Sequence, residues 1–187
     1  MRMIKVDALA GSLLIALFCL SRVAAAADLD PALQASVTAK IKEVQTWAAD
    51  PAIVDAVKEY NAGKSPQAAA MDQATWVSTS VIDPFVRGLT KTPAAQVLKT
   101  KRGDVVSEAF LSGVDGGKVA FLGKPTNWSH KDQPKHELPM SGKTWQGDVE
   151  VDESSGLRQV QIAVPVLDSG KPIGSLVVGL GVGTLAK

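Results

Sequence analysis

The chain has 187 residues, with 20 basic and 19 acidic side chains and a formal net charge of +1. This near balance argues against a nucleic-acid-binding protein, because such proteins present a basic face. The single cysteine, Cys19, excludes an intramolecular disulfide and any site built from several cysteines.

Residues 1–27 have the layout of a cleavable secretory signal peptide. Two basic residues give a positive start, an apolar run extends from Ala8 to Leu20, and small residues follow from Ala24 to Ala27. The apolar run is too short to span a bilayer as a stable helix. We therefore expect export, with a soluble periplasmic remainder whose net charge is about −1. Cys19 lies in the removed segment, and a secreted chain without cysteine suits a bacterial periplasm.

Residues 28–102 predict the helical half of a single domain. A capping side chain precedes a proline five times, at Asp30-Pro31, Asp50-Pro51, Ser65-Pro66, Asp83-Pro84 and Thr92-Pro93. The side-chain oxygen can accept a free N–H of the first turn, and proline has no N–H to leave unpaired there. The first helix should be the longest, because its apolar residues recur at spacings of three and four from Leu33 to Ala48. The third is expected to run from Pro66 through Trp76.

Residues 103–187 predict the other half of the same domain, an antiparallel sheet. The expected strands are Val105–Leu111, Lys118–Leu122, Lys143–Val151, Gln159–Val166 and Ile173–Val182. In the fourth strand valine and isoleucine alternate with Gln159, Gln161 and Ala163. The valine and isoleucine face should meet the long helix, which leaves the glutamines on the opposite face. Helices followed by strands indicate an α+β fold.

Several stretches together resemble the Cache family of PAS-like extracytoplasmic sensor domains. They are residues 47–54, Lys124-Pro125-Thr126-Asn127-Trp128, residues 142–147, Asp152–Gly156, residues 160–166 and residues 170–174. The resemblance implies a long N-terminal helix, a five-stranded antiparallel PAS-like sheet, and a small ligand between the sheet and the loops after its second strand. Members usually sit between two membrane helices and control an output module. Because this chain ends at Lys187, we expect a stand-alone periplasmic form, with a membrane-bound receptor or kinase as a possible partner.

Six residues are candidates for binding a small ligand: Asn127, Trp128, His130, Lys143, Trp145 and Gln161. Tryptophan can wall a pocket, and the polar side chains can fix a ligand's orientation. Lysine and histidine beside aromatic walls favour a small organic acid or an amino acid, and Trp128 and Trp145 are expected to flank one cavity. The plainer alternatives are a core tryptophan, a solvated lysine and an exposed glutamine.

Catalytic and metal sites are not expected. The sequence has no nucleophile elbow and no phosphate-binding loop. His130 and His136 are the only histidines, whereas zinc needs three or four protein ligands. We therefore expect no cofactor and no enzymatic activity. Two alternatives remain: a protein-interaction module that docks on a membrane receptor, and an unrecognised hydrolase.

Overall fold

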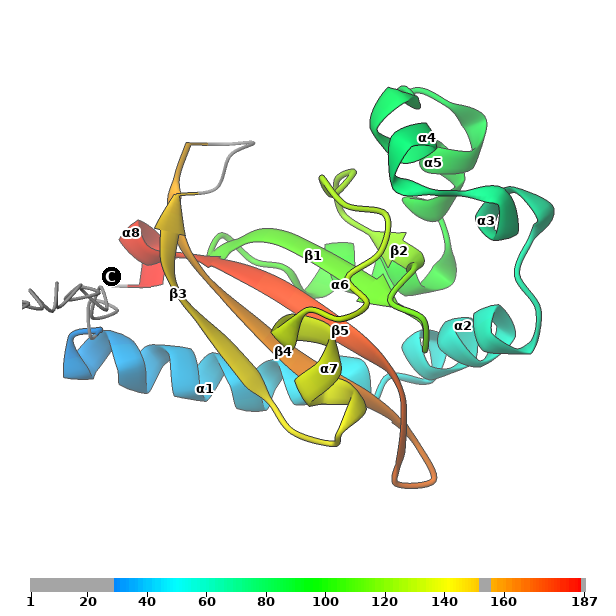
Figure 1. Ribbon diagram of the computed structural model, residues 1–187. Helices are drawn as coiled ribbons and strands as arrows, with labels where there is room; N and C mark the ends of the chain where they lie inside the picture. Colours follow the sequence, from blue (N-terminus) through cyan, green and yellow to red (C-terminus); the bar gives the residue numbers. More distant parts are fainter. Residues whose placement is uncertain (1–28, 152–155, 186–187) are drawn as a thin grey trace, which may run out of the picture.

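The computed structural model describes residues 29–151 and 156–185 (Figure 1). The predicted signal peptide, residues 1–27, lies outside the described residues. Within them, no helix combines the length and the hydrophobicity that crossing a membrane requires.

Six helices form the N-terminal half: α1 (Pro31–Ala48), α2 (Pro51–Ala62), α3 (Pro66–Ala70), α4 (Gln73–Ser78), α5 (Pro84–Leu89) and α6 (Pro93–Lys101). All five predicted caps accept a backbone N–H of the first helical turn, namely Asp30, Asp50, Ser65, Asp83 and Thr92. The expected third helix is in fact two, because the side chain of Asp72 accepts the Thr75 N–H and starts α4.

Five antiparallel strands form one sheet in the order β2-β1-β5-β4-β3. The strands are β1 (Val106–Ser112), β2 (Lys118–Phe121), β3 (Trp145–Val151), β4 (Arg158–Asp168) and β5 (Lys171–Gly181). The predicted α+β class is confirmed. Several details of the sheet half were wrong. β3 begins at Trp145 rather than Lys143, β5 ends at Gly181 rather than Val182, and two helices were missed, α7 (Pro134–Met140) and α8 (Val182–Leu185).

The two faces of the sheet carry different layers. On one face, the long helix α1 runs across the strands (Figure 1), and its Val37 and Val44 belong to the same core cluster as Val160 and Ile162 of β4. On the other face, a second cluster joins helical and loop aromatics to Ala163 of β4 and Val177 of β5. The expectation that valine and isoleucine of β4 meet the long helix is confirmed. The Ala163 face is therefore the one that carries polar side chains from β4.

Candidate functional site

A polar cavity of about 210 Å³ lies on the sheet face opposite α1. Its strand residues are Glu108 and Phe110 of β1, Glu150 and Val151 of β3, and Gln159 and Gln161 of β4; the rest of the wall is Pro125, Thr126, Asn127, His130 and Lys135. The strand residues come together because β1 and β4 both pair with β5 and β3 pairs with β4. The loop after β2 and helix α7 close the cavity above the sheet.

A carboxylate and two amides form the sheet side of the polar cavity. One oxygen of Glu108, Oε1, accepts hydrogen bonds from Nε2 of Gln159 at 3.0 Å and from Nε2 of Gln161 at 2.6 Å. The amide oxygen of Gln161 accepts from Lys135 Nζ at 2.5 Å. The second oxygen of Glu108 has no donor among the described residues, so it is the oxygen free to meet a ligand.

A buried lysine lies behind the histidine wall of the cavity. Lys118 has 0% of its surface exposed, and its Nζ lies 2.8 Å from His130 Nδ1, 3.2 Å from the Gly116 carbonyl oxygen and 4.9 Å from the Phe110 ring centre. The His130 ring stacks on Phe110 at 4.8 Å. Because an ammonium group only donates, His130 Nδ1 accepts when Lys118 is protonated, and the ring proton is then on Nε2. His130 can thus present an N–H donor.

Burial controls the charge of this pair. It lowers the pKa of Lys118 from 10.5 to about 7, with a further decrease from the charge of Lys135. Burial also places the pKa of His130 far below its ordinary value, and the positive charge of Lys118 adds to the effect. His130 is therefore a neutral hydrogen-bonding group at neutral pH, whereas Lys118 titrates there.

Helix α4 holds the loop that walls the cavity. The side chain of Gln73 donates to the Thr126 carbonyl oxygen at 3.1 Å and accepts the backbone N–H of Trp128 at 2.9 Å. The indole N–H of Trp76, which is fully buried, donates to the Pro125 carbonyl oxygen at 2.8 Å. Three loop positions, Pro125, Thr126 and Trp128, are thus fixed by two side chains of one short helix.

Three of the six predicted site residues, Asn127, His130 and Gln161, line the polar cavity. Trp145 is half-buried, and its ring lies 5.8 Å from Nζ of Lys135, a residue of the cavity wall. Trp128 is buried and packs on Trp76 at 5.1 Å. It belongs to the second core cluster, against which Trp145 also packs.

Lys143 is exposed and lies before β3, outside the residues that line the polar cavity. It therefore does not share a strand face with Trp145, as it would in the expected strand Lys143–Val151. The charges that sequence reasoning did not place in the site are Lys135, Lys118, Glu108 and Glu150. For Lys135 the available signal was its position after the second expected strand, where the resemblance places the ligand-binding loops. For Lys118 no signal exists in the sequence.

The second histidine has a structural environment. His136 Nδ1 lies 2.8 Å from Ser175 Oγ, and its Nε2 lies 3.3 Å from the Val114 carbonyl oxygen. A serine beside a histidine can be a nucleophile and its base. Here both residues are buried, Ser175 at 0% and His136 at 1% exposure. Neither lines the polar cavity, so a substrate in that cavity would not reach the Ser175 hydroxyl. Among residues 29–151 and 156–185, no group of His, Cys, Asp and Glu could hold a metal ion.

Comparison with known proteins gives structural similarity only. No known family model and no curated protein matches the sequence. The sensor domain of the histidine kinase DctB of V. cholerae is 16% identical, with a TM-score of 0.50, over 82% of this chain and 53% of that one. The ligand-binding domain of the chemoreceptor PctC of Pseudomonas aeruginosa, in complex with GABA, is 14% identical with a TM-score of 0.46, over 82% and 56%.

The sensory domain of the Campylobacter jejuni chemoreceptor Tlp3 is 12% identical with a TM-score of 0.43, over 84% of this chain and 66% of that one. With 53% of the DctB sensor domain covered, the chain spans about half the length of that domain. At 16% identity the similarity to the DctB sensor domain concerns the fold, and it confirms the expected one: the chain has the PAS-like fold of Cache-type sensor domains.

Proposed function

We propose that this protein is a periplasmic, sensor-type binding domain whose polar cavity takes a small organic acid or an amino acid. The observation that carries the proposal is the presence of both signs of charge in one small cavity. Lys135 and the His130 N–H can meet a carboxylate, while Glu108 and Glu150 can meet an ammonium group.

The cavity favours an amino acid over a dicarboxylic acid. A volume of 210 Å³ is that of about seven liquid waters, which limits the ligand to a small molecule. A second carboxylate on the ligand would face the carboxylates of Glu108 and Glu150, and like charges disfavour each other. An amino acid instead places an ammonium group there. Lysine binds a carboxylate as a point charge without arginine's two-pronged geometry, so modest affinity is expected.

The direct test is calorimetry of the chain without residues 1–27 against alanine, propionate and ethylamine. Alanine should bind, and Lys135→Met should weaken its binding at least about tenfold, because a hydrogen bond from a charged group is lost. Lys143→Met is the matched control, since Lys143 is exposed and outside the cavity, and it should bind alanine like the parent. Equal affinity in Lys135→Met, or no binding of any small amino or organic acid, would overturn the proposal.

The periplasmic location rests on the signal-peptide layout of residues 1–27. Protein isolated from its native cells should begin near residue 27 when its N-terminus is sequenced. An intact N-terminal segment would contradict the location without affecting the cavity.

A second candidate function is docking on a membrane-bound receptor or kinase. The observation that favours it is a group of exposed apolar side chains at the end of α4 and just after it, Val77, Val81 and Ile82, at 65%, 63% and 73% exposure. Exposed apolar patches often mark interaction sites. The calorimetry above separates the two functions, because a pure docking module would bind no small acid.

A further inference from the structure

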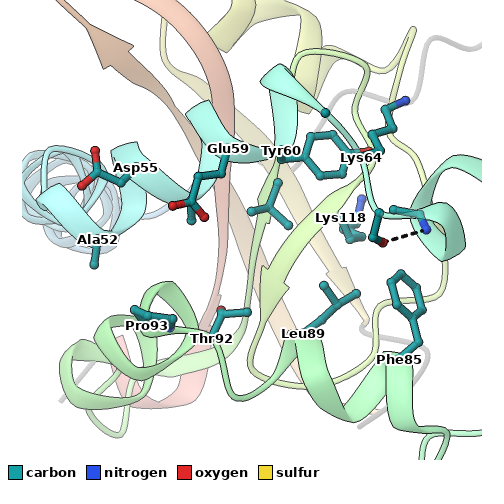
Figure 2. Close-up of a pocket in the computed structure, with 15 residues that line it drawn as sticks. Ala52, Asp55, Glu59, Tyr60, Lys64, Phe85, Leu89, Thr92, Pro93 and Lys118 are labelled. Carbon is teal, nitrogen blue, oxygen red and sulfur yellow. Dashed lines mark hydrogen bonds between the residues drawn. The ribbon is translucent and has the colours of Figure 1, made fainter.

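A second and larger cavity, of about 600 Å³, lies between α2 and the pair α5 and α6 (Figure 2). We call it the helix-lined cavity. Figure 2 shows α2 along one side, with Asp55, Glu59 and Tyr60, and Phe85, Leu89 and Pro93 along the other. Its volume falls in the range of small-molecule sites. Its residues are different from those of the polar cavity, so it needs its own explanation.

The body of the helix-lined cavity is apolar. Ala68, Phe85, Leu89, Pro93 and Val119 contribute to its wall. Phe85 and Leu89 are half-buried, which means that part of their apolar surface is left for a ligand to cover. An occupant therefore needs an apolar body of its own.

The cations at the cavity have partners, whereas in the described part of the chain the carboxylates of α2 do not. Lys64 forms an ion pair with Asp115, and Lys118 Nζ is bonded to the Gly116 carbonyl oxygen and to His130. In contrast, neither carboxylate of α2, that of Asp55 or that of Glu59, has a hydrogen-bond or ion-pair partner among the described residues. The two lie four residues apart, on the same face of the helix. In Figure 2 the Glu59 side chain extends from α2 toward the start of α6.

We propose that the helix-lined cavity is a second small-molecule site, which takes an amine with an apolar body. The apolar part would pack on Phe85 and Leu89, and the ammonium group would lie beside the Glu59 carboxylate, with Asp55 reinforcing the negative potential. An apolar acid is disfavoured because both cations at the cavity already have partners, whereas both α2 carboxylates are unpaired. This inference does not depend on the function proposed for the polar cavity.

The test uses three probes of similar shape: phenethylamine, 2-phenylethanol and 3-phenylpropionate. Calorimetry should show phenethylamine binding about fivefold tighter than the alcohol, with the acid weakest, as expected for exposed ion pairs. In Glu59→Gln the amine should bind no tighter than the alcohol. Asp55→Asn should reduce, without abolishing, the preference for the amine over the alcohol. Leu89→Trp fills the cavity and should weaken all three probes, with folding checked by circular dichroism.

Two matched variants locate the site. Asp104→Asn removes an exposed carboxylate outside this cavity and should leave phenethylamine binding unchanged. Lys135→Met alters only the polar cavity and should also leave it unchanged. The proposal is overturned if the parent binds the three probes equally or does not bind phenethylamine. It is also overturned if Glu59→Gln keeps the parent's preference for the amine over the alcohol, or if Lys135→Met loses amine binding.

Discussion

Lys118 is a strand lysine with no exposed surface, and its ammonium group has three polar contacts: the Ser112 hydroxyl, the Gly116 carbonyl oxygen and His130. Those contacts compensate only part of the desolvation, which is why its pKa is lowered to about 7. The unfolded chain keeps the ordinary pKa near 10.5. Between these two values the unfolded state binds more protons than the folded state, so the free energy of unfolding rises with pH.

The first prediction follows from this difference. The stability of the parent should rise between pH 7 and pH 9, with a contribution from Lys118 of up to about 1.4 kcal/mol per pH unit. Lys118→Met cannot titrate and should show a flatter profile in urea denaturation at several pH values. Lys143→Met, which removes an exposed lysine, should keep the parent's slope. Parallel profiles for the parent and Lys118→Met would contradict the prediction.

A second pH effect concerns His130, whose pKa is lowered by burial. Below pH 6.5 the unfolded chain protonates this histidine while the folded chain does not, so stability should fall as the pH decreases from 6.5. The test is urea denaturation of the parent and of His130→Asn at pH 6.5 and pH 4.5. The free energy of unfolding should fall less between these pH values in His130→Asn than in the parent. A loss of equal size in both proteins would assign the acid sensitivity to other groups.

The individual residues also mark the limit of sequence reasoning about the site. Asn127, His130 and Gln161 could be predicted, because a long loop and a strand of alternating polarity point to one face of a sheet. Lys118 could not, since a lysine that begins a strand after a turn looks solvent-exposed, and only the folded loop after β2 covers it. The lysine chosen from the sequence, Lys143, lies before β3, whereas Lys135 lies on α7, a helix that the sequence analysis missed.

Among the elements, β5 is packed so closely at Gly174 that no side chain fits there. A Cβ added at Gly174 would fall on the Ser112 carbonyl oxygen of β1 and would lie 2.8 Å from Val57 Cγ1 of α2. Both neighbours are held, one by the sheet backbone and the other by the core, where Val57 is fully buried. The glycine is therefore required by the close approach of both the β1 backbone and α2.

Gly174→Ala should accordingly lower the free energy of unfolding by about 1–3 kcal/mol, the usual effect of overpacking. Gly123→Ala is the control, because a Cβ there meets nothing within 4 Å. Thermal denaturation of both variants measures the effect. If Gly174→Ala is as stable as Gly123→Ala, the β1 backbone and α2 can both move away from this position at little cost.

The elements themselves were largely predictable, for reasons that differ from one to the next. The five capped prolines define helix starts by local chemistry alone, and each is used as such. Helix α7 was missed because it has no side-chain cap at Gln133 and contains Pro139, so local chemistry does not indicate it. Its position is instead set by contact with the sheet, which buries His136 and Pro139.

At the scale of the whole molecule, the helical half and the sheet half meet at the wall of the polar cavity. Gln73 and Trp76 of α4 bond to the loop after β2, and Nζ of Lys124 in that loop bonds back to the carbonyl oxygens of Trp76 and Thr79 at 2.6 and 2.7 Å. The loop therefore depends for its shape on a helix that comes about 50 residues earlier. A ligand in the polar cavity would touch the loop, while α4 determines where the loop lies.

This arrangement gives the last prediction, on Gln73→Ala. The variant removes the acceptor of the Trp128 backbone N–H, so exchange of that amide with solvent should become faster whatever the cavity binds. If the polar cavity binds an amino acid as proposed, alanine affinity should also fall about tenfold, because the loop loses hydrogen bonds worth roughly 1 kcal/mol each. Gln67→Ala is the matched control: it removes an exposed helical glutamine whose side chain makes no hydrogen bond in the part of the chain that the structure describes. Faster exchange with unchanged affinity would show that the ligand does not need this wall, whereas unchanged exchange would mean that α4 does not hold the loop.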